Sequence, residues 1–343
     1  MEKILEIKNL NTSFFTHVGE VKAVRNVSIT LEKGEALGIV GESGSGKSVT
    51  MLSIMKLLTD NGKLIEGEII FDNVDITKYS NKAMRNIRGN SMSMIFQDPM
   101  TSLNPVLTIE KQMIEPIMLH KKVSKQEGIK LAIDMLKLVG IPSPEARLKQ
   151  YPHEFSGGMR QRVMIAMALS CDPKLIIADE PTTALDVTIQ AQILELFKDI
   201  RKKLNTSIIL ITHDLGIVAD LCDTVNVMYG GCIIERGSTR EIFYNSRHPY
   251  TWGLLNSIPN PKTLTREKLK PIDGQTPDLL EPPKGCPFAP RCEYAMEVCL
   301  EEMPKDFSIK TIDNKSSIHT AACFLNHPDA PKIERPLRKE LPL

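Results

Sequence analysis

Short apolar segments alternate with segments of helical spacing along the first two thirds of the chain. Apolar residues at every second position predict strands, whereas apolar residues that recur every three or four positions predict helices. We therefore expect strands at residues 3–10, 21–31, 36–40, 68–71, 92–96, 174–178 and 207–211. We expect helices at residues 48–58, 109–120, 126–139, 157–170 and 188–204.

The order of these elements predicts an α/β fold, because strands that alternate with helices usually form a mostly parallel sheet with helices on its faces. No strand pattern occurs within residues 108–150, so we expect a helical subdomain of about 98–165 inserted into a domain that spans 1–250. Prolines and turn residues dominate after about residue 248, and we expect turns there. Residues 251–343 are predicted to form a separate C-terminal extension.

Composition narrows the class of protein. The chain has 343 residues, 42% of them apolar and 25% charged, which is ordinary for a soluble globular protein. Its 43 Lys and Arg residues balance 42 Asp and Glu residues, whereas general nucleic-acid binders usually carry a basic excess. No run approaches the roughly 18 apolar residues of a membrane helix, and the N-terminus lacks the pattern of a signal peptide. We expect a cytoplasmic chain that meets a membrane only through partners.

A glycine-rich segment lies between the strand expected at 36–40 and the helix expected at 48–58. It matches the phosphate-binding pattern G-x-x-x-x-G-K-[ST] in its proper place between a strand and a helix. Backbone N–H groups of such a loop surround a phosphate chain, and the helix dipole points at the same charge. Lys47 would reach the β- and γ-phosphates, and the Ser48 hydroxyl would bind Mg²⁺. The expected nucleotide contacts are Gly41, Glu42, Ser43, Gly44, Ser45, Gly46, Lys47, Ser48 and Val49.

Two carboxylates, Asp179 and Glu180, come directly after the apolar strand at 174–178. Acidic residues at the end of a buried strand are usually functional, because burial of an unpaired carboxylate costs much free energy. Beside a phosphate loop, Asp179 suits the carboxylate that holds Mg²⁺ and its waters. Glu180 suits the base that polarises an attacking water.

A second anion-binding segment is predicted at Ser156, Gly157 and Gly158. Ser156 is placed to cap the helix expected at 157–170, and the free N–H groups of the first helical turn can donate to a phosphate. A single nucleotide site needs only one such segment. The second one is explained if it serves the ATP bound by another subunit.

With these motifs the sequence resembles the ATP-binding cassette (ABC) family of P-loop nucleotide hydrolases, whose signature reads close to Leu-Ser-Gly-Gly-Gln and whose ATPase domains pair head to tail. Phe155 and Met159 replace the first and last residues of that signature, while its Ser-Gly-Gly core is intact. The resemblance implies that Gln97 contacts Mg²⁺ and water and hinges the helical subdomain. Asp186 corresponds to the loop that contacts the opposite subunit.

Two more site residues follow from the same resemblance. His213, directly after the strand expected at 207–211, corresponds to the histidine near the γ-phosphate. Phe14 is our choice for the aromatic ring that stacks on adenine, with the adjacent Phe15 as the alternative. Two neighbouring aromatic residues this early in a domain also fit a purely structural role in the core.

Three further segments, at residues 97–105, 179–188 and 247–251, resemble the D-type ATP-binding subunits of bacterial oligopeptide and dipeptide ABC importers. Together with the cysteine-rich region they extend the resemblance over essentially the whole chain. It implies a translocase subunit that hydrolyses ATP, with Mg²⁺ as cofactor, to drive peptide import. Importers of nickel and other small solutes share this type of ATPase and are the alternative for the solute.

The resemblance also implies a set of partners. A second ABC ATPase subunit would complete a head-to-tail heterodimer, and two transmembrane permease subunits would lie above the pair. An extracellular peptide-binding protein would act on the complex indirectly, and no nucleic acid is involved. The chain would then sit peripherally on the cytoplasmic face of the cell membrane.

Four of the seven cysteines, Cys286, Cys292, Cys299 and Cys323, cluster near the C-terminus. Four thiols in one small region suggest a four-thiolate site for a [4Fe–4S] cluster or for structural zinc, and free buried thiols are the other possibility. We discount disulfides because cytoplasmic thiols stay reduced. Some importers of the resembling family carry a [4Fe–4S] cluster at matching cysteines, which favours that group. Core or surface thiols are expected at Cys171, Cys222 and Cys232.

Three other classes of protein fit the sequence less well. Cassette ATPases of DNA repair need a long coiled-coil arm between the phosphate loop and the signature, and those of translation usually carry two cassettes, whereas this chain has one phosphate loop and no heptads. A regulatory subunit with a degenerate site would lack Glu180 or His213, and both are present. Exporters usually carry membrane helices in the same chain as the cassette.

Overall fold

The computed structural model describes residues 2–98, 102–183, 185–258, 272–312 and 318–336. Residues 99–101, which continue the motif at Gln97, and Ala184, which precedes Asp186, lie outside the described residues. The chain divides into two compact units. Unit 1 comprises Met1–Ile4, Leu31–Glu35 and Lys78–Leu210, and unit 2 comprises Leu5–Thr30, Ala36–Thr77 and Ile211–Leu343.

Unit 1 is built on parallel strands. β6 (Met92–Ile95) and β7 (Leu175–Asp179) pair in parallel, with Met92 opposite Leu175. β8 (Ser207–Thr212), which unit 1 shares up to Leu210, follows β7 in the strand order. All residues of β7 and β8 are buried, as expected for central strands covered on both faces. The parallel sheet predicted from the sequence is therefore confirmed.

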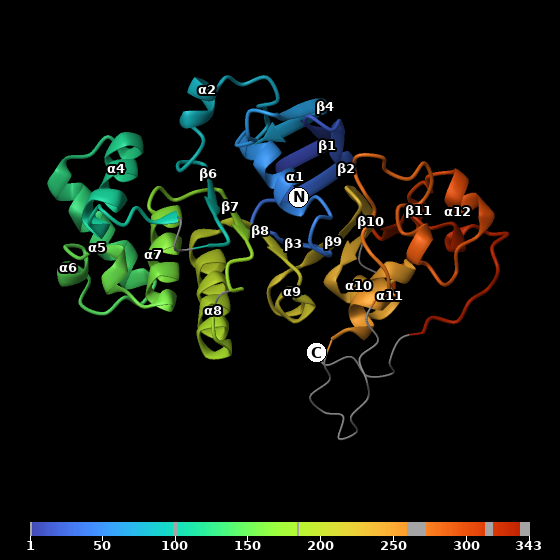
Figure 1. Ribbon diagram of the computed structural model, residues 1–343. Helices are drawn as coiled ribbons and strands as arrows, with labels where there is room; N and C mark the ends of the chain where they lie inside the picture. Colours follow the sequence, from blue (N-terminus) through green and yellow to red (C-terminus); the bar gives the residue numbers. More distant parts are fainter. Residues whose placement is uncertain (1, 99–101, 184, 259–271, 313–317, 337–343) are drawn as a thin grey trace. The chain divides into compact units, whose positions relative to one another are not determined.

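The helices of unit 1 include a lobe drawn in green in Figure 1. α4 (Ile109–Lys121) packs against α5 (Lys125–Leu138), and α5 packs against α7 (Gly157–Leu169). A reciprocal pair of hydrogen bonds between Ser124 and Glu127 starts α5. The remaining helices of the unit are α2 (Asn81–Arg85), α6 (Pro144–Arg147), the 3-10 turn η1 (Pro152–Glu154) and α8 (Val187–Leu204).

Unit 2 contains an antiparallel sheet that the strand-helix alternation did not predict. Its order is β2-β1-β4-β5, formed by β1 (Lys3–Phe15), β2 (Glu20–Glu32), β4 (Gly62–Phe71) and β5 (Val74–Asp75). Leu5 of β1 lies opposite Phe71 of β4, and Phe14 lies opposite Gly62. The strand predicted at 68–71 is longer than expected because its first half pairs with the end of β1.

Five strands of unit 2 follow one another in the order β11-β12-β10-β9-β3. β3 (Ala36–Val40) is parallel to β9 (Thr224–Tyr229), and β10 (Cys232–Ser238) is antiparallel to β9 and to β12 (Thr320–Ala321). β11 (Phe307–Ser308) pairs with β12. The C-terminal region therefore adds β12 and β11 beside β10, at the edge of the sheet that contains β3.

The helices of unit 2 correct two expectations. α1 (Lys47–Met55) ends earlier than the predicted 58, because Lys56 adopts a left-handed conformation, with φ +50°, and caps the helix. Turns were predicted after residue 248, but α11 (Pro249–Asn256) begins there, since Pro249 occupies the first helical turn and the His248 side chain caps it. The other helical elements are α9 (Leu215–Leu221), α10 (Thr239–Asn245), η2 (Ala289–Arg291), α12 (Glu297–Glu301) and η3 (Phe324–Asn326).

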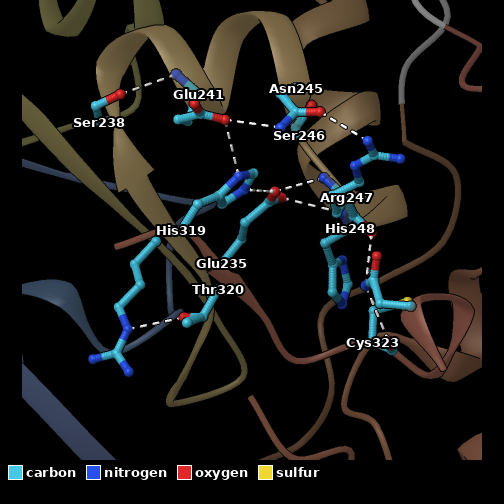
Figure 2. Close-up of polar contacts among 12 residues, drawn as sticks. Glu235, Ser238, Glu241, Asn245, Ser246, Arg247, His248, His319, Thr320 and Cys323 are labelled. Atoms are coloured by element: carbon cyan, nitrogen blue, oxygen red, sulfur yellow. Dashed lines mark hydrogen bonds and ion pairs between the residues drawn. The ribbon is translucent and has the colours of Figure 1, made fainter. Parts of the chain in front are cut away.

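A buried polar cluster joins the C-terminal segment to β10 and α10, and Figure 2 shows the His319 ring between two carboxylates. His319 Nε2 lies 3.0 Å from Glu235 and His319 Nδ1 lies 3.2 Å from Glu241, and all three side chains are fully buried. Glu235 also accepts the backbone N–H groups of Arg247 and His248. We call Glu235, Glu241 and His319 the buried triad.

Among the described residues, no helix is both long and apolar enough to cross a bilayer.

Candidate nucleotide site and cysteine cavity

The phosphate-loop motif joins β3 to α1 within unit 2, as predicted. Gly46 has φ +97° and forms the N-cap of α1, and a Cβ atom there would come within 2.5 Å of the Ala23 carbonyl oxygen. Gly44 has φ +77° and faces open space. Left-handed backbone favours glycine, so the loop needs glycine at both positions to fold this way.

Lys47 lies inside this loop and its side chain is buried. Its Nζ donates to the carbonyl oxygens of Gly41, at 2.7 Å, and Glu42, at 2.8 Å. The ammonium group is thereby held over the loop, where a phosphate chain would meet it. Ser48 and Val49 follow in the first turn of α1, whose free N–H groups favour an anion.

Two other predicted site residues belong to unit 2: Phe14 lies on β1, and His213 follows β8. His213 directly follows β8 and is exposed, and Asp214 caps α9. Phe14 lies against Gly62, where a Cβ atom would approach the ring to 2.8 Å. Phe15 is 44% exposed, and Lys63 Nζ lies 5.4 Å from its ring centroid. Adenine stacking and the γ-phosphate contact stay predictions.

Glu180 is the most constrained of the predicted residues in unit 1. It follows β7 with φ +46°, a left-handed conformation that is strained for a residue other than glycine. Its carboxylate accepts a hydrogen bond from Gln97 Nε2 at 2.9 Å and another from Thr183 Oγ1 at 2.9 Å. The structure thus brings together two residues that are 83 positions apart, while the adjacent Asp179 is buried at the end of β7.

The signature segment begins α7, where the Ser156 side chain accepts the N–H of Met159. A Cβ atom on Gly158 would lie 2.9 Å from Ile189 Cγ2, so glycine permits close packing between the first turns of α7 and α8. A Cβ atom on Gly157 would meet nothing within 4 Å. No contact among the described residues explains the glycine at 157.

Asp186, at the start of α8, shows a structural role. Its side chain accepts the N–H of Ile189 at 3.0 Å and caps the helix. Aspartate is among the preferred residues at this position of a helix. Contact of Asp186 with an opposite subunit stays a prediction.

The four clustered cysteines line one cavity of unit 2, together with His248, Phe288 and other residues. Burial raises the pKa of Cys286 to about 12 and that of Cys292 to about 11, and it raises the pKa of Cys323 as well. Burial therefore favours the neutral thiol form of these three cysteines in the chain alone. Thiol donors suit iron or zinc, which would stabilise their thiolate forms.

The positions of these side chains do not by themselves form a metal centre. In the part of the chain that the structure describes, no group of three or more His, Cys, Asp or Glu side chains is arranged to hold a metal ion. The donor chemistry of the cavity fits the predicted group, and the arrangement adds no independent support for it. The three other cysteines are buried away from the cavity: Cys171, Cys222 and Cys232.

Two residues that contact the phosphate loop were not predicted from the sequence as site residues. Arg291 pairs with the Glu42 carboxylate, and the Tyr250 hydroxyl accepts the Glu42 N–H. Tyr250 belongs to the segment 247–251, which resembles peptide importers. The segment alone does not indicate that the Tyr250 hydroxyl accepts the Glu42 N–H. Arg291 carries no motif, and only the fold brings it to Glu42.

Two family models match the sequence. The model described as ABC transporter matches residues 24–183, and the model described as oligopeptide/dipeptide transporter, C-terminal region, matches residues 234–299. The first match contains the phosphate loop, the signature and the two carboxylates after β7. The second contains the segment 247–251 and three of the clustered cysteines.

Curated relatives match over nearly the full length of the chain. The oligopeptide transport ATP-binding protein OppD of Bacillus subtilis is 56% identical over 335 residues, which cover 97% of this chain and 92% of the relative. The dipeptide transport ATP-binding protein DppD of the same organism is 57% identical over 326 residues, which cover 95% of each chain. OppD of Salmonella typhimurium is 52% identical and covers 88% of this chain and 89% of the relative.

Solved structures agree with the fold. The ATP-binding cassette MJ0796, in a dimeric post-hydrolysis state bound to ADP and Pi, is 28% identical with a TM-score of 0.62, and the match covers 69% of this chain and 99% of that one. The cassette cbiO1 from Clostridium perfringens is 31% identical with a TM-score of 0.61, over 71% of this chain and 92% of that one. The chain therefore belongs to the ABC transporter family of ATPases, among the oligopeptide and dipeptide transport ATP-binding proteins.

Proposed function

We propose that this chain hydrolyses ATP to power the import of oligopeptides or dipeptides across the cytoplasmic membrane. The proposal is carried by one observation: a complete set of ATPase motifs and the C-terminal region of peptide transporters occur in the same chain. Relatives named for oligopeptide or dipeptide transport match 97% and 95% of this chain.

The proposed reaction assigns a role to each group that the structure positions. Lys47 binds the β- and γ-phosphates, and the Glu180 carboxylate accepts the proton of the attacking water. Ser48, Gln97 and Asp179 are the residues that would hold Mg²⁺, which when bound neutralises charge on the phosphates. His213 would lie near the γ-phosphate. Catalysis of this kind depends mostly on positioning and on electrostatic stabilisation.

The open space at Gly157 supports the proposal that a second ATPase subunit completes the site. Ser156, Gly157, Gly158 and Asp186 would then face the ATP bound by that subunit in a head-to-tail heterodimer. An N-terminal helical turn with free N–H groups suits a phosphate supplied from outside the chain. Two transmembrane permease subunits and, indirectly, an extracellular peptide-binding protein complete the importer at the cytoplasmic face of the membrane.

We also propose a functional division of the chain. Residues 1–250 form the nucleotide-binding domain, and its helical subdomain of about 98–165 passes motion to the permease subunits. Residues 251–343 form the C-terminal extension. The cavity of its four cysteines is also lined by His248 and Pro249, so the extension packs against the start of α11.

Purification of the chain from membranes tests the proposed function. We expect two polytopic permeases and a second ATPase to co-purify, and we expect ATP hydrolysis in proteoliposomes to rise when peptide and its binding protein are added. Stimulation by nickel or another small solute in place of peptides would assign the chain to the alternative importers. A chain that co-purifies with no permease would contradict the proposal.

For the cysteine cavity we propose a [4Fe–4S] cluster, with zinc as the alternative. The four thiols that line one cavity are the type of donor that iron and zinc prefer. Protein purified without oxygen should contain iron and sulfide in equal amounts and be brown. Cys323→Ser should lose both, whereas Cys171→Ser, which changes a buried thiol outside the cavity, should keep them. Stoichiometric zinc in colourless protein would contradict the cluster.

A further inference from the structure

The Glu42 side chain of the phosphate loop is bound by an arginine from the C-terminal extension. Arg291 Nη1 lies 2.6 Å from Glu42 Oε2, and Arg291 Nη2 lies 3.1 Å from Glu42 Oε1. The arginine side chain is 6% exposed and the glutamate side chain 28%. Two parallel N–H bonds to one carboxylate fix the direction of both groups, and a single charge contact would not.

The guanidinium group is itself held in place by other parts of unit 2. Arg291 Nη1 also donates to Tyr229 Oη at 3.1 Å, and its remaining N–H groups donate to the carbonyl oxygens of Ile272, at 2.8 Å, and Asp273, at 2.7 Å. The hydrogen bonds that Arg291 donates to the Glu42 carboxylate raise the pKa of Arg291, so the guanidinium stays charged. Arg291 is therefore a fixed cation beside the phosphate loop.

A tyrosine holds the same loop residue through its backbone. The Glu42 N–H donates to Tyr250 Oη at 2.7 Å. The Tyr250 ring lies 4.6 Å from the Tyr229 ring and 5.3 Å from the Phe288 ring, measured between centroids. Phe288 lies between Cys286 and Cys292 in the chain, so the aromatic cluster connects the phosphate loop to the cysteine cavity.

The position of Glu42 matters for two reasons. Its carbonyl oxygen accepts a hydrogen bond from Lys47, so a shift of Glu42 would also shift the cation that meets the phosphates. Its carboxylate adds a negative charge to a loop that binds a polyanion. Arg291 compensates this charge, and removal of one partner would leave the other charge unpaired in a largely buried place.

We propose that Arg291 is a positioning residue for ATP binding, which acts through Glu42 and makes the C-terminal extension a part of the nucleotide site. The inference rests on the proposed function of the phosphate loop. It predicts that a chain without this ion pair folds but binds nucleotide weakly.

The test measures the dissociation constant of MgATP for the full chain and for Arg291→Gln. We expect affinity about tenfold weaker in the variant, as for loss of one partner of a buried, hydrogen-bonded charge pair. In the membrane complex the KM for ATP should rise by a similar factor while kcat stays within about twofold, because Arg291 touches no reacting atom. Arg291→Lys keeps the charge but loses the paired hydrogen bonds, and we expect an intermediate affinity.

The double variant Glu42→Gln with Arg291→Gln should bind MgATP more tightly than Arg291→Gln alone, because no unpaired carboxylate remains in the loop. Arg236→Gln is the matched control, since Arg236 of β10 pairs with Asp306 of the same extension, away from the phosphate loop. It should bind MgATP like the wild type.

Equal affinity in Arg291→Gln and Arg236→Gln would overturn the inference. So would a double variant no tighter than Arg291→Gln. If Arg291→Gln does not fold, Arg291→Lys decides the test. Wild-type affinity of Arg291→Lys for MgATP would leave Arg291 a structural role alone and overturn the inference. Reduced affinity for MgATP would support it. A wild-type chain that binds no MgATP would overturn the proposed function as well.

Discussion

At the scale of the residue, Glu180, the proposed base, is a carboxylate that the backbone holds in a strained conformation. The left-handed φ of Glu180 costs free energy that other contacts must offset, and strain of this kind concentrates at functional sites. Hydrogen bonds from Gln97 and Thr183 fix the direction of the carboxylate. An acceptor fixed in this way needs little reorganisation when a water molecule is to be deprotonated.

We expect Glu180→Gln to bind MgATP with nearly wild-type affinity and to hydrolyse it at least about 10²-fold more slowly, because an amide cannot accept the proton. Lys47→Ala should instead lose binding and turnover together. Equilibrium binding and steady-state phosphate release separate the two cases. Glu195→Gln, which changes a surface glutamate that pairs with Lys198 in α8, serves as the control. Unchanged turnover in Glu180→Gln would remove this residue from the role of base.

At the scale of the element, helix boundaries are set by a few side chains that satisfy the first N–H groups. Ser124 caps α5 in both directions: its side chain accepts the Glu127 N–H, and the Glu127 carboxylate accepts the Ser124 N–H at 2.9 Å. The Ser124 N–H and the Ser124 hydroxyl both donate to the Glu127 carboxylate, and these two hydrogen bonds lower its pKa. Ser156 and Asp186 start α7 and α8 with single caps of the same kind. These caps fix the residues at which α7 and α8 begin.

We expect Ser124→Ala to reduce the free energy of unfolding by about 1 kcal/mol, as measured by urea denaturation. Because the hydrogen bonds from Ser124 lower the pKa of Glu127, the stability that they contribute depends on pH. It is fully present above the ordinary glutamate pKa and is lost as the pH falls through the lowered value. The difference between wild type and Ser124→Ala should therefore shrink in acid. Ser143→Ala is the control, because Ser143 precedes α6 without a side-chain cap, and a constant difference at all pH values would contradict the assignment.

The elements also show what sequence patterns can predict. β3 has the predicted bounds because five consecutive apolar or small residues are buried on both faces. The strands at Thr224–Tyr229 and Cys232–Ser238 were missed, since their pairing depends on a turn at Gly230 and Gly231 and on contacts with β3 and β12. Among site residues, motifs predicted Lys47 and Glu180. The partners of Glu42 are 208 and 249 positions away in sequence, so no local pattern could identify them.

At the scale of the whole molecule, the buried triad joins the C-terminal segment to earlier elements of unit 2. His319 of that segment contacts Glu235 of β10 and Glu241 of α10. The His319 ring bridges Glu235 and Glu241 through its two nitrogens. Glu241 also accepts the Ile312 N–H at 2.6 Å, and Asn245 donates to the Lys310 carbonyl oxygen. The buried triad therefore fixes a segment whose strand pairing, at β12, is short.

We expect His319→Leu to reduce the free energy of unfolding by about 3–5 kcal/mol, because two buried carboxylates lose their shared partner. Urea denaturation measures the loss, and limited proteolysis should cut the C-terminal segment of the variant faster. His17→Leu, a change of an exposed histidine in the same unit, should stay within about 0.5 kcal/mol of the wild type. A loss in His319→Leu as small as in His17→Leu would show that the triad does not hold the segment.

The pairing of two ATPase subunits gives the last prediction. Gly157→Ala adds a methyl group where this chain has open space, at a helix start where alanine is favoured over glycine. The isolated chain should therefore fold and bind MgATP normally, and ATP hydrolysis in the assembled importer should fall by at least about tenfold, because the methyl group would lie against the ATP of the partner subunit. Gly128→Ala, in α5, places its methyl group at ordinary contact distance from Met118 and is the control for added bulk in a helix. Full activity of Gly157→Ala in the complex would mean that no nucleotide approaches this helix start, and the head-to-tail arrangement would then lose its structural support in this chain.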